Sequence, residues 1–193
     1  IGTGIGTYSV SCGDYDNSGT LDVTVSNRHE SSVEVFLSPL TLGMPPTLTL
    51  GTDGAPYGLV SGNFNGDSLT DIAVACQGPS SLQFFLQAES TGLPATPSLQ
   101  ISLTMSPSKV VQGDMNFDSR SDLLVLSESD CAVLGFYQGI SPLWSSTASF
   151  SFPCGTRPRS ALVGDLTGDG LPDIGVTSAR DDWSGSSMAV YPS

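Results

Sequence analysis

The chain has 193 residues and a net charge of −13, and it contains one lysine and one histidine. Such a surface repels nucleic acid and anionic lipid, which excludes partners of those kinds. No stretch approaches the roughly 18 apolar residues of a membrane-spanning helix, so no membrane span is expected. The 22 glycines and 13 prolines suit short strands joined by turns.

Short apolar or alternating runs, separated by turn residues, predict β-strands along the whole chain. In chain order, the expected strands cover 9–13, 22–26, 32–38, 47–51, 57–62, 71–76, 82–87, 98–103, 109–113, 122–127, 131–137, 147–152, 161–165, 173–178 and 187–192. They fall into three groups of four strands and a last group of three. The expected organisation is therefore the end of a fourth strand at 1–7, repeat 1 at 8–56, repeat 2 at 57–107, repeat 3 at 108–158, and repeat 4 at 159–193 without its last strand.

One aspartate-rich segment occurs four times without gaps. Its copies start at Gly13, Gly62, Gly113 and Gly164, so they are spaced by 49, 51 and 51 residues. The first copy reads Gly-Asp-Tyr-Asp-Asn-Ser-Gly-Thr-Leu-Asp, and an apolar strand follows each copy. A nearly constant period of this length indicates a repeat architecture.

Each repeat has the composition of one β-propeller blade, which consists of four short antiparallel strands. The strand after each segment, such as DIAVAC at 71–76, is apolar on both faces. A single blade cannot bury both of its faces, so the blades must stack. The expected fold is all-β, with four β-propeller-like, four-stranded antiparallel blades in tandem. These blades form a closed ring or part of a larger or head-to-tail assembly.

The two chain ends are expected to be complementary, because repeat 4 lacks a fourth strand and Gly4–Thr7 precedes the first strand of repeat 1. The N-terminal strand either completes the last blade of its own chain and closes a ring, or completes a blade of a neighbouring copy. The second arrangement is self-association through the chain ends. The N-terminus lacks the charged and apolar regions of a signal peptide. Because the chain begins inside a repeat, we expect a processed or fragmentary product.

Oxygen-bearing side chains fall at positions 1, 3, 5 and 9 of each segment, counted from the residue after its first glycine. They are Asp14, Asp16, Ser18 and Asp22 in loop one, Asn63, Asn65, Asp67 and Asp71 in loop two, Asp114, Asn116, Asp118 and Asp122 in loop three, and Asp165, Thr167, Asp169 and Asp173 in loop four. Position 7 adds a backbone carbonyl from Thr20, Leu69, Arg120 or Leu171, and position 6 (Gly19, Ser68, Ser119 or Gly170) is expected to turn sharply. Alternate spacing in a curled loop aims oxygen atoms at one centre. Hard oxygen ligands without His or Cys suit Ca²⁺.

The loops hold 11 of the 19 acidic residues, and clustered carboxylates repel one another unless a cation neutralises them. Up to four Ca²⁺ ions are therefore expected, with site two the weakest because it has only two carboxylates. Each ion would clip two strands together, so the expected calcium is structural. The alternative is a set of Asx-turns without metal.

The segment D-x-[DN]-x-[SD]-G-x-x-D, the apolar strand after it and the stretch Asp53-Gly-Ala-Pro-Tyr-Gly58 resemble the FG-GAP repeat of integrin α-chain propellers and the related VCBS repeats. The resemblance covers essentially the whole chain. It implies that Asp14, Asp16, Ser18, Asp22 and their counterparts are calcium ligands. The sequence departs from the pattern at Asn63 and Asn65, which weaken site two, and at Thr167. Integrin propellers usually have seven blades, so four repeats leave ring closure open.

The expected function is a calcium-stabilised extracellular module that serves in adhesion or in binding a protein or glycan ligand, because the resemblance implies such roles. The alternative is a structural subunit of an extracellular fibre or surface assembly, built by head-to-tail strand exchange. An enzyme is not expected. His29 lies in a predicted turn, and the acids outside the loops, such as Glu30, Glu128 and Asp130, are the only basis for a less favoured polysaccharide-active enzyme.

Two further kinds of side chain carry expectations. Trp144 and Trp183 lie in predicted loops, where they either stack on sugar or anchor the loops by packing. The four cysteines lack the spacing of a zinc site, and their even number favours an oxidising compartment. Cys131 and Cys154 are a candidate disulfide, with free thiols as the alternative, whereas Cys12 and Cys76 are expected to be free.

Overall fold

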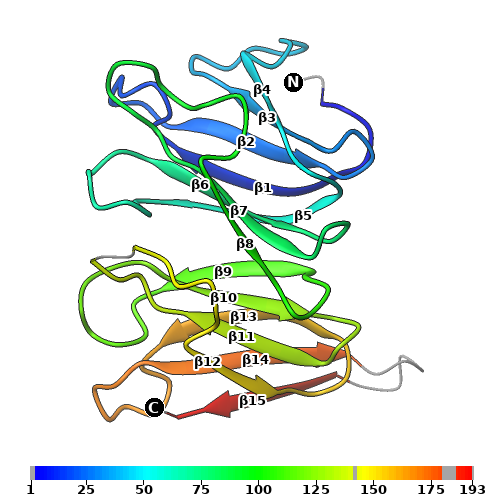
Figure 1. Cartoon of the computed structure of the whole chain (residues 1–193), viewed down its shortest axis with the longest axis vertical. Helices are drawn as coiled ribbons and strands as arrows, with labels where there is room; N and C mark the ends of the chain where they lie inside the picture. Colours follow the sequence, from blue (N-terminus) through cyan, green and yellow to red (C-terminus); the bar gives the residue numbers. More distant parts are fainter. Residues whose placement is uncertain (1–2, 141–142, 180–185, 193) are drawn as a thin grey trace.

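The computed structural model describes residues 3–140, 143–179 and 186–192, and the ordered elements among them are all β-strands (Figure 1). The strands are β1 (Thr7–Gly13), β2 (Asp22–Asn27), β3 (Ser32–Phe36), β4 (Leu48–Gly51), β5 (Pro56–Gly62), β6 (Asp71–Cys76), β7 (Ser81–Phe85), β8 (Leu99–Ser102), β9 (Lys109–Gly113), β10 (Asp122–Ser127), β11 (Ala132–Phe136), β12 (Phe150–Pro153), β13 (Pro158–Gly164), β14 (Asp173–Ala179) and β15 (Ser186–Tyr191). Among these residues no helix has the length and apolar character needed to cross a membrane.

The strands form four antiparallel meanders, which we call blades 1 to 4 in chain order. Blades 1, 2 and 3 have the orders β1-β2-β3-β4, β5-β6-β7-β8 and β9-β10-β11-β12, and blade 4 has the order β13-β14-β15. Consecutive blades pack through their first strands, β1 on β5, β5 on β9 and β9 on β13. The blades therefore form an arc with blades 1 and 4 at its two ends (Figure 1). The predicted all-β, blade-like fold is confirmed.

The N-terminal residues do not form the fourth-strand end that the sequence suggested for 1–7. Residues 1 and 2 lie outside the described residues, residues 3–6 form coil and a turn, and Thr7 already belongs to β1. The physical reason is local, because the backbone N–H of Gly4 donates to Glu34 of blade 1 at 3.1 Å. The segment is thus held on its own blade and does not complete blade 4.

The core consists of three apolar layers, one between each pair of neighbouring blades. Along each strand, alternate residues face the preceding and the following blade, as the two-residue period of a strand requires. In β7, for example, Leu82 and Phe84 face blade 3, whereas Phe85 packs in the layer with blade 1. Burial on both faces explains why the central strands read as continuous apolar runs.

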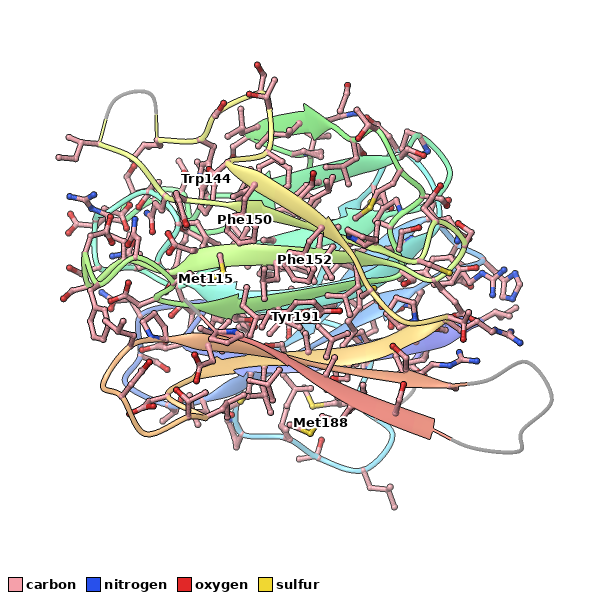
Figure 2. All side chains as sticks on the ribbon, turned by 90° about the horizontal axis from the view of Figure 1, so that it is seen from below. Met115, Trp144, Phe150, Phe152, Met188 and Tyr191 are labelled. Carbon is pink, nitrogen blue, oxygen red and sulfur yellow. The ribbon has the colours of Figure 1, made fainter. Side chains whose placement is uncertain are left out.

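Blade 4 has an apolar face that no other described residue covers. Leu162, Met188 and Val190 are 47%, 59% and 40% exposed. Figure 2 shows Met188 on the far side of blade 4, while Met115, Phe152 and Tyr191 lie between blades 3 and 4. The equivalents of Met188 in the inner blades are Leu82 and Val133, and both are fully buried. The exposed positions are therefore blade-interface positions that lack a neighbour.

Candidate metal centre

The four aspartate-rich loops share one backbone conformation. Each joins the first and second strands of its blade, and positions 4 and 6 have positive φ in every copy. Position 4 is Asn17, Gly66, Phe117 or Gly168, and position 6 is Gly19, Ser68, Ser119 or Gly170. The turn predicted at position 6 is present, with φ of 82°, 73°, 66° and 83° in loops one to four. Left-handed backbone at two alternate positions curls the loop and brings its side chains to the inside.

The aspartate at position 9 is fully buried in all four loops and ties the loop to the blade. In loop two, Asp71 accepts hydrogen bonds from the backbone N–H of Phe64 at 2.7 Å and of Gln87 at 2.8 Å. The bond to position 2 recurs at Asp22 with Tyr15, at Asp122 with Met115 and at Asp173 with Leu166. The bond to the outer loop recurs at Asp22 with Ser38 and at Asp122 with Gln138. Position 9 thus has a structural role besides its expected role as a ligand.

Burial of this carboxylate has an electrostatic cost. Desolvation is the main cause that raises the pKa of Asp71 to about 6. The backbone hydrogen bonds from Phe64 and Gln87 lower this pKa, and the nearby charge of Asp67 raises it. Desolvation raises the pKa of Asp122 in the same way. A cation in the loop would favour the ionised forms and offset this cost.

Loop one has the geometry that best fits a divalent cation. Asp14, Asp16 and Asp22 each offer a carboxylate oxygen, and these oxygens lie within 4.8 Å of one another. Desolvation opposes ionisation of Asp14, yet backbone hydrogen bonds from Gly19 and Ser18 lower its pKa below the ordinary value. Three carboxylates at this spacing are a suitable ligand set for Ca²⁺. Within the described ranges, no other group of three acidic, His or Cys residues comes this close.

In loops two and four, as in loop one, the expected ligands bond to groups of the loop itself. In loop two, the amide of Asn65 donates to Asp67 at 2.7 Å, and the oxygen of Asn63 accepts from the Gly66 N–H at 2.7 Å. In loop four, Asp165 accepts from the N–H groups of Gly168 and Gly170, Asp169 accepts from that of Leu171, and the Thr167 N–H bonds to Asp173. Most of these contacts are Asx-turn bonds, which loop one also contains. Loops two and four fit a cation less well because, within the described ranges, they bring no three carboxylates as close together as loop one does.

Loop three contains a competitor for the cation. Asp114 accepts from the N–H groups of Asp118 and Ser119, and the guanidinium of Arg120 donates to Asp118 at 3.1 Å. The Asn116 amide donates to the same Asp118 oxygen at 3.2 Å. Arg120 was expected to supply only a carbonyl, and its side chain instead places a positive charge beside an expected ligand. The carbonyls of Thr20, Leu69, Arg120 and Leu171 remain predicted ligands.

Trp144 is not a sugar platform. It is only 6% exposed, its indole N–H donates to the carbonyl of Phe64 at 2.9 Å, and its ring lies 4.9 Å from that of Phe84. The packing alternative is therefore confirmed for Trp144, whereas Trp183 lies outside the described residues. His29 is exposed in the turn after β2, as expected.

The candidate disulfide is not formed, although the two cysteines are neighbours across a strand pair. The Cys154 N–H donates to the Cys131 carbonyl at 2.8 Å, but both thiols are free. The Cys131 sulfur instead lies 3.7 Å from the carbonyl oxygen of Glu128, because residue 131 sits in a tight turn with φ of 51°. Cys12 and Cys76 are also free.

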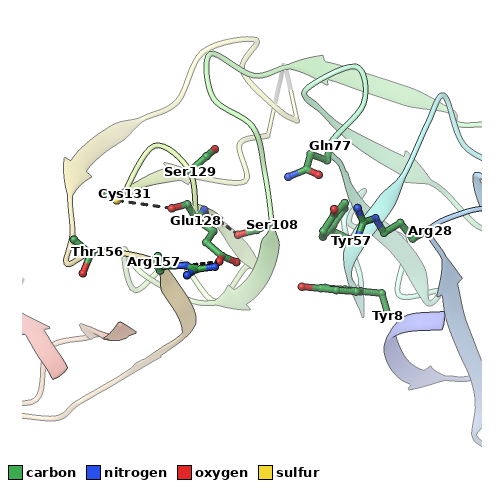
Figure 3. Close-up of a pocket in the computed structure, with 10 residues that line it drawn as sticks. All are labelled: Tyr8, Arg28, Tyr57, Gln77, Ser108, Glu128, Ser129, Cys131, Thr156 and Arg157. Carbon is green, nitrogen blue, oxygen red and sulfur yellow. Dashed lines mark hydrogen bonds and ion pairs between the residues drawn. The ribbon is translucent and has the colours of Figure 1, made fainter. Parts of the chain in front are cut away.

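A pocket on the axis of the arc was not foreseen from the sequence. It has a volume of about 560 Å³ and lies at the strand ends opposite the aspartate-rich loops (Figure 3). We call it the axial pocket; it is lined by Tyr8, Arg28, Tyr57, Gln77, Ser108, Glu128, Ser129, Cys131, Thr156 and Arg157. Two positions of the repeat supply six of these ten residues. One position lies five residues before the first glycine of the aspartate-rich segment (Tyr8, Tyr57 and Ser108), and the other lies fifteen residues after it (Arg28, Gln77 and Glu128).

The comparisons with known proteins agree with this architecture. Residues 114–176 match the family model described as an FG-GAP-like repeat, and a comparison with curated proteins gave no match. BBS1N, in a crystal structure with ARL6DN, is 14% identical with a TM-score of 0.66, over 97% of this chain and 58% of that chain. A Lactobacillus plantarum protein is 8% identical with a TM-score of 0.53, over 95% and 54%. The V. cholerae biofilm matrix protein Bap1 is 14% identical with a TM-score of 0.61, over 95% and 26%.

Identities of this size show the fold alone. This chain spans little more than half of the BBS1N and L. plantarum chains and about a quarter of the Bap1 chain. The resemblance read from the sequence is confirmed where the family model matches, from the first aspartate of loop three to the strand after loop four. The chain therefore carries the FG-GAP-like repeat over residues 114–176 and folds as an arc of β-propeller blades.

Proposed function

We propose that this chain is a calcium-stabilised extracellular β-propeller module that binds a protein or glycan ligand, as in adhesion. The observation that carries the calcium part is the cluster of Asp14, Asp16 and Asp22, whose carboxylate oxygens lie within 4.8 Å of one another. In a chain with a net charge of −13, such a cluster is costly without a cation. Millimolar free calcium is found outside cells, which is why we place the module there.

A binding role is favoured over catalysis because the acidic side chains are already used structurally. The buried aspartates at position 9 accept backbone hydrogen bonds, and Glu128 is paired with Arg157 at 2.9 Å and Arg159 at 3.0 Å. Two similar folds fit the proposal. The BBS1N structure contains a bound protein, ARL6DN, and Bap1 is a biofilm matrix protein.

Thermal unfolding with and without calcium tests the proposal. Because the sites form only in the folded chain, calcium at 100 times its Kd stabilises by about 2.7 kcal/mol per site. EDTA should then lower the Tm by about 5 to 10 °C, and excess calcium should restore it while equal magnesium should not. An unchanged Tm in EDTA, with metal content below one ion per chain, would overturn the calcium proposal.

The second candidate function is a structural subunit that assembles head to tail. The observation that favours it is the uncovered face of blade 4, where Leu162, Met188 and Val190 are exposed, together with the free edge of β15. At the other end of the arc, Val10 of blade 1 is 66% exposed, although its equivalent Leu59 in blade 2 is 3% exposed. Faces of this kind mark interaction sites.

Light scattering across a concentration series tests the assembly. A subunit should gain mass with concentration, and Leu162→Glu should keep it monomeric because it places a charge on the uncovered face. The matched control is Leu42→Glu, which adds the same charge at a fully exposed loop residue. A monomeric mass for the unmodified chain at all concentrations would exclude this role.

A further inference from the structure

The axial pocket gathers the positive charge of an acidic chain. The sequence contains six lysine and arginine residues in total. Arg28 and Arg157 line the axial pocket, and Lys109 and Arg159 line an adjoining hollow that shares Tyr8 and Glu128 with it. Four of the six basic side chains therefore surround one space. The aspartate-rich loops at the opposite strand ends hold 11 of the 19 acidic residues and, among the basic residues, only Arg120, so the basic side chains are segregated from most of the acids.

The single acidic side chain of the pocket does not cancel this charge. Glu128 receives hydrogen bonds from Arg157 at 2.9 Å and from Arg159 at 3.0 Å, so one carboxylate is shared by two guanidinium groups. With Arg28 and Lys109 added, the side chains that line the two hollows carry four positive formal charges and one negative formal charge. A local field of this sign inside an acidic protein favours an anionic ligand.

The pocket residues come from β-bulges and strand ends that point at the axis. The first strands of blades 1, 2 and 4 have a register shift near their starts, which leaves Tyr8, Tyr57 and Arg159 unpaired. Bulges commonly re-aim a side chain toward a site. The equivalent residue of blade 3, Ser108, lines the same space. At this position of the repeat, Tyr8, Tyr57 and Ser108 line the axial pocket, and Arg159 lines the adjoining hollow.

One side of the pocket is aromatic. The rings of Tyr8 and Tyr57 meet edge to face at 4.8 Å, and the guanidinium of Arg28 lies over the Tyr57 ring at 4.5 Å. Figure 3 shows these three side chains together, across the pocket from Glu128 and Arg157. Tyr8 is 49% exposed, and within the described residues the Arg28 guanidinium forms no hydrogen bond or ion pair. An exposed ring beside an available planar cation suits a ligand that has an apolar face and bears a carboxylate.

We propose that the axial pocket binds an acidic sugar residue of the uronic acid class. Its carboxylate would bind Arg28, which offers a planar fork for two parallel hydrogen bonds. One face of the sugar ring would stack on Tyr8, and its hydroxyl groups would reach Gln77, Ser108 and Thr156 at the rim. The volume of about 560 Å³ lies within the range of small-molecule sites. This inference rests on the proposed ligand-binding function and names the class of ligand.

A matched pair of sugars tests the inference. Calorimetric titration of the calcium-loaded chain with methyl galacturonoside and with methyl galactoside compares two ligands that differ only in the carboxylate. The acidic sugar should bind at least about tenfold more tightly, and its affinity should fall with added salt. Arg28→Gln should weaken that binding by about tenfold or more. Gln100→Glu changes the net charge equally at an exposed position of β8 and should leave the affinity unchanged.

Each outcome decides the matter. Equal affinity for the two sugars, or an Arg28→Gln chain that binds as tightly as the unmodified one, would overturn the inference. Binding of glutarate as tight as that of the acidic sugar would also overturn it, because the site would then recognise a carboxylate and not a sugar. The thermal unfolding test with calcium is independent of these titrations. If calcium stabilises the chain but the acidic sugar does not bind, the proposal of a calcium-stabilised module stands and the inference of a uronic acid ligand is wrong.

Discussion

The indole N–H of Trp144 donates a hydrogen bond of 2.9 Å to the backbone carbonyl of Phe64, 80 residues earlier in the chain. Trp144 belongs to the loop between β11 and β12 of blade 3, whereas Phe64 is position 2 of loop two in blade 2. The Trp144 ring also packs against Phe84. This side chain therefore links an outer loop to the neighbouring blade and to its aspartate-rich loop.

Replacement of Trp144 should weaken the fold by two separable amounts. Trp144→Ala removes a large buried side chain and should cost about 3–5 kcal/mol, because the site cannot fully collapse. Trp144→Phe keeps most of the packing but leaves the Phe64 carbonyl without its donor, at a cost of about 1–3 kcal/mol. Urea denaturation followed by circular dichroism measures both. Leu42→Ala, at a fully exposed loop residue, is the control, and equal midpoints for all variants would contradict the linking role.

The pH dependence of stability should reveal Asp71 in the calcium-free chain. Its folded pKa is raised from 3.8 to about 6 by desolvation, so the unfolded state loses the proton first as the pH rises. The free energy of unfolding should therefore fall between about pH 4 and pH 6 in EDTA. Asp71→Asn should flatten this part of the profile, while Glu89→Gln, at an exposed loop residue, should not. A profile that rises over this interval and is unchanged by Asp71→Asn would refute the desolvation argument.

Calcium affinity should differ among the loops in an order set by charge. Asp16→Asn removes one of the three clustered carboxylates of loop one, so it should abolish the tightest site in a calcium titration. Arg120→Gln removes the guanidinium that bonds to Asp118 and should tighten loop three by several-fold. Calorimetry with both variants measures the change. If the Asp16→Asn chain retains the tightest site, that site must lie in a loop other than loop one.

The thiols of Cys12 and Cys76 should differ sharply in reactivity. Cys76 is fully buried, and burial raises the pKa of its thiol to about 12, whereas Cys12 is exposed on β1. Because the thiolate is the reactive form, a disulfide reagent at pH 8 should modify Cys12 rapidly and Cys76 only after unfolding. Mass spectrometry of the modified chain reads both sites. Rapid labelling of Cys76 in the folded chain would show that blades 1 and 2 open readily.

The strands and loops could be predicted because their signals are local and repeat four times. The spacing of Asp14, Asp16 and Asp22 and the apolar strand that follows recur at a nearly constant period, so each copy supports the others. The left-handed turn at position 6 was also predictable, although Phe117 at position 4 was not, because a bulky residue seldom adopts a positive φ.

The axial pocket could not be predicted from any local pattern. Tyr8, Tyr57 and Glu128 come from three different blades and Arg157 from the connection between blades 3 and 4, so they meet only after the blades have stacked. Tyr8 precedes the first expected strand at 9–13, and no local signal marks the register shift between Thr7 and Ser9 that leaves it unpaired. The buried role of the position 9 aspartates was hidden for a related reason, since partners such as Ser38 and Gln87 lie in outer loops that carry no motif.

The arrangement in which each layer of the core belongs to just two adjacent blades has an evolutionary consequence. Loss or addition of one unit of about 50 residues at an end of the array would remove or add a complete layer and leave the remaining ones intact. Gene-level changes of whole units should thus be tolerated more readily than deletions of a few residues inside a sheet. Arrays of different length can arise in this way from a single ancestral module.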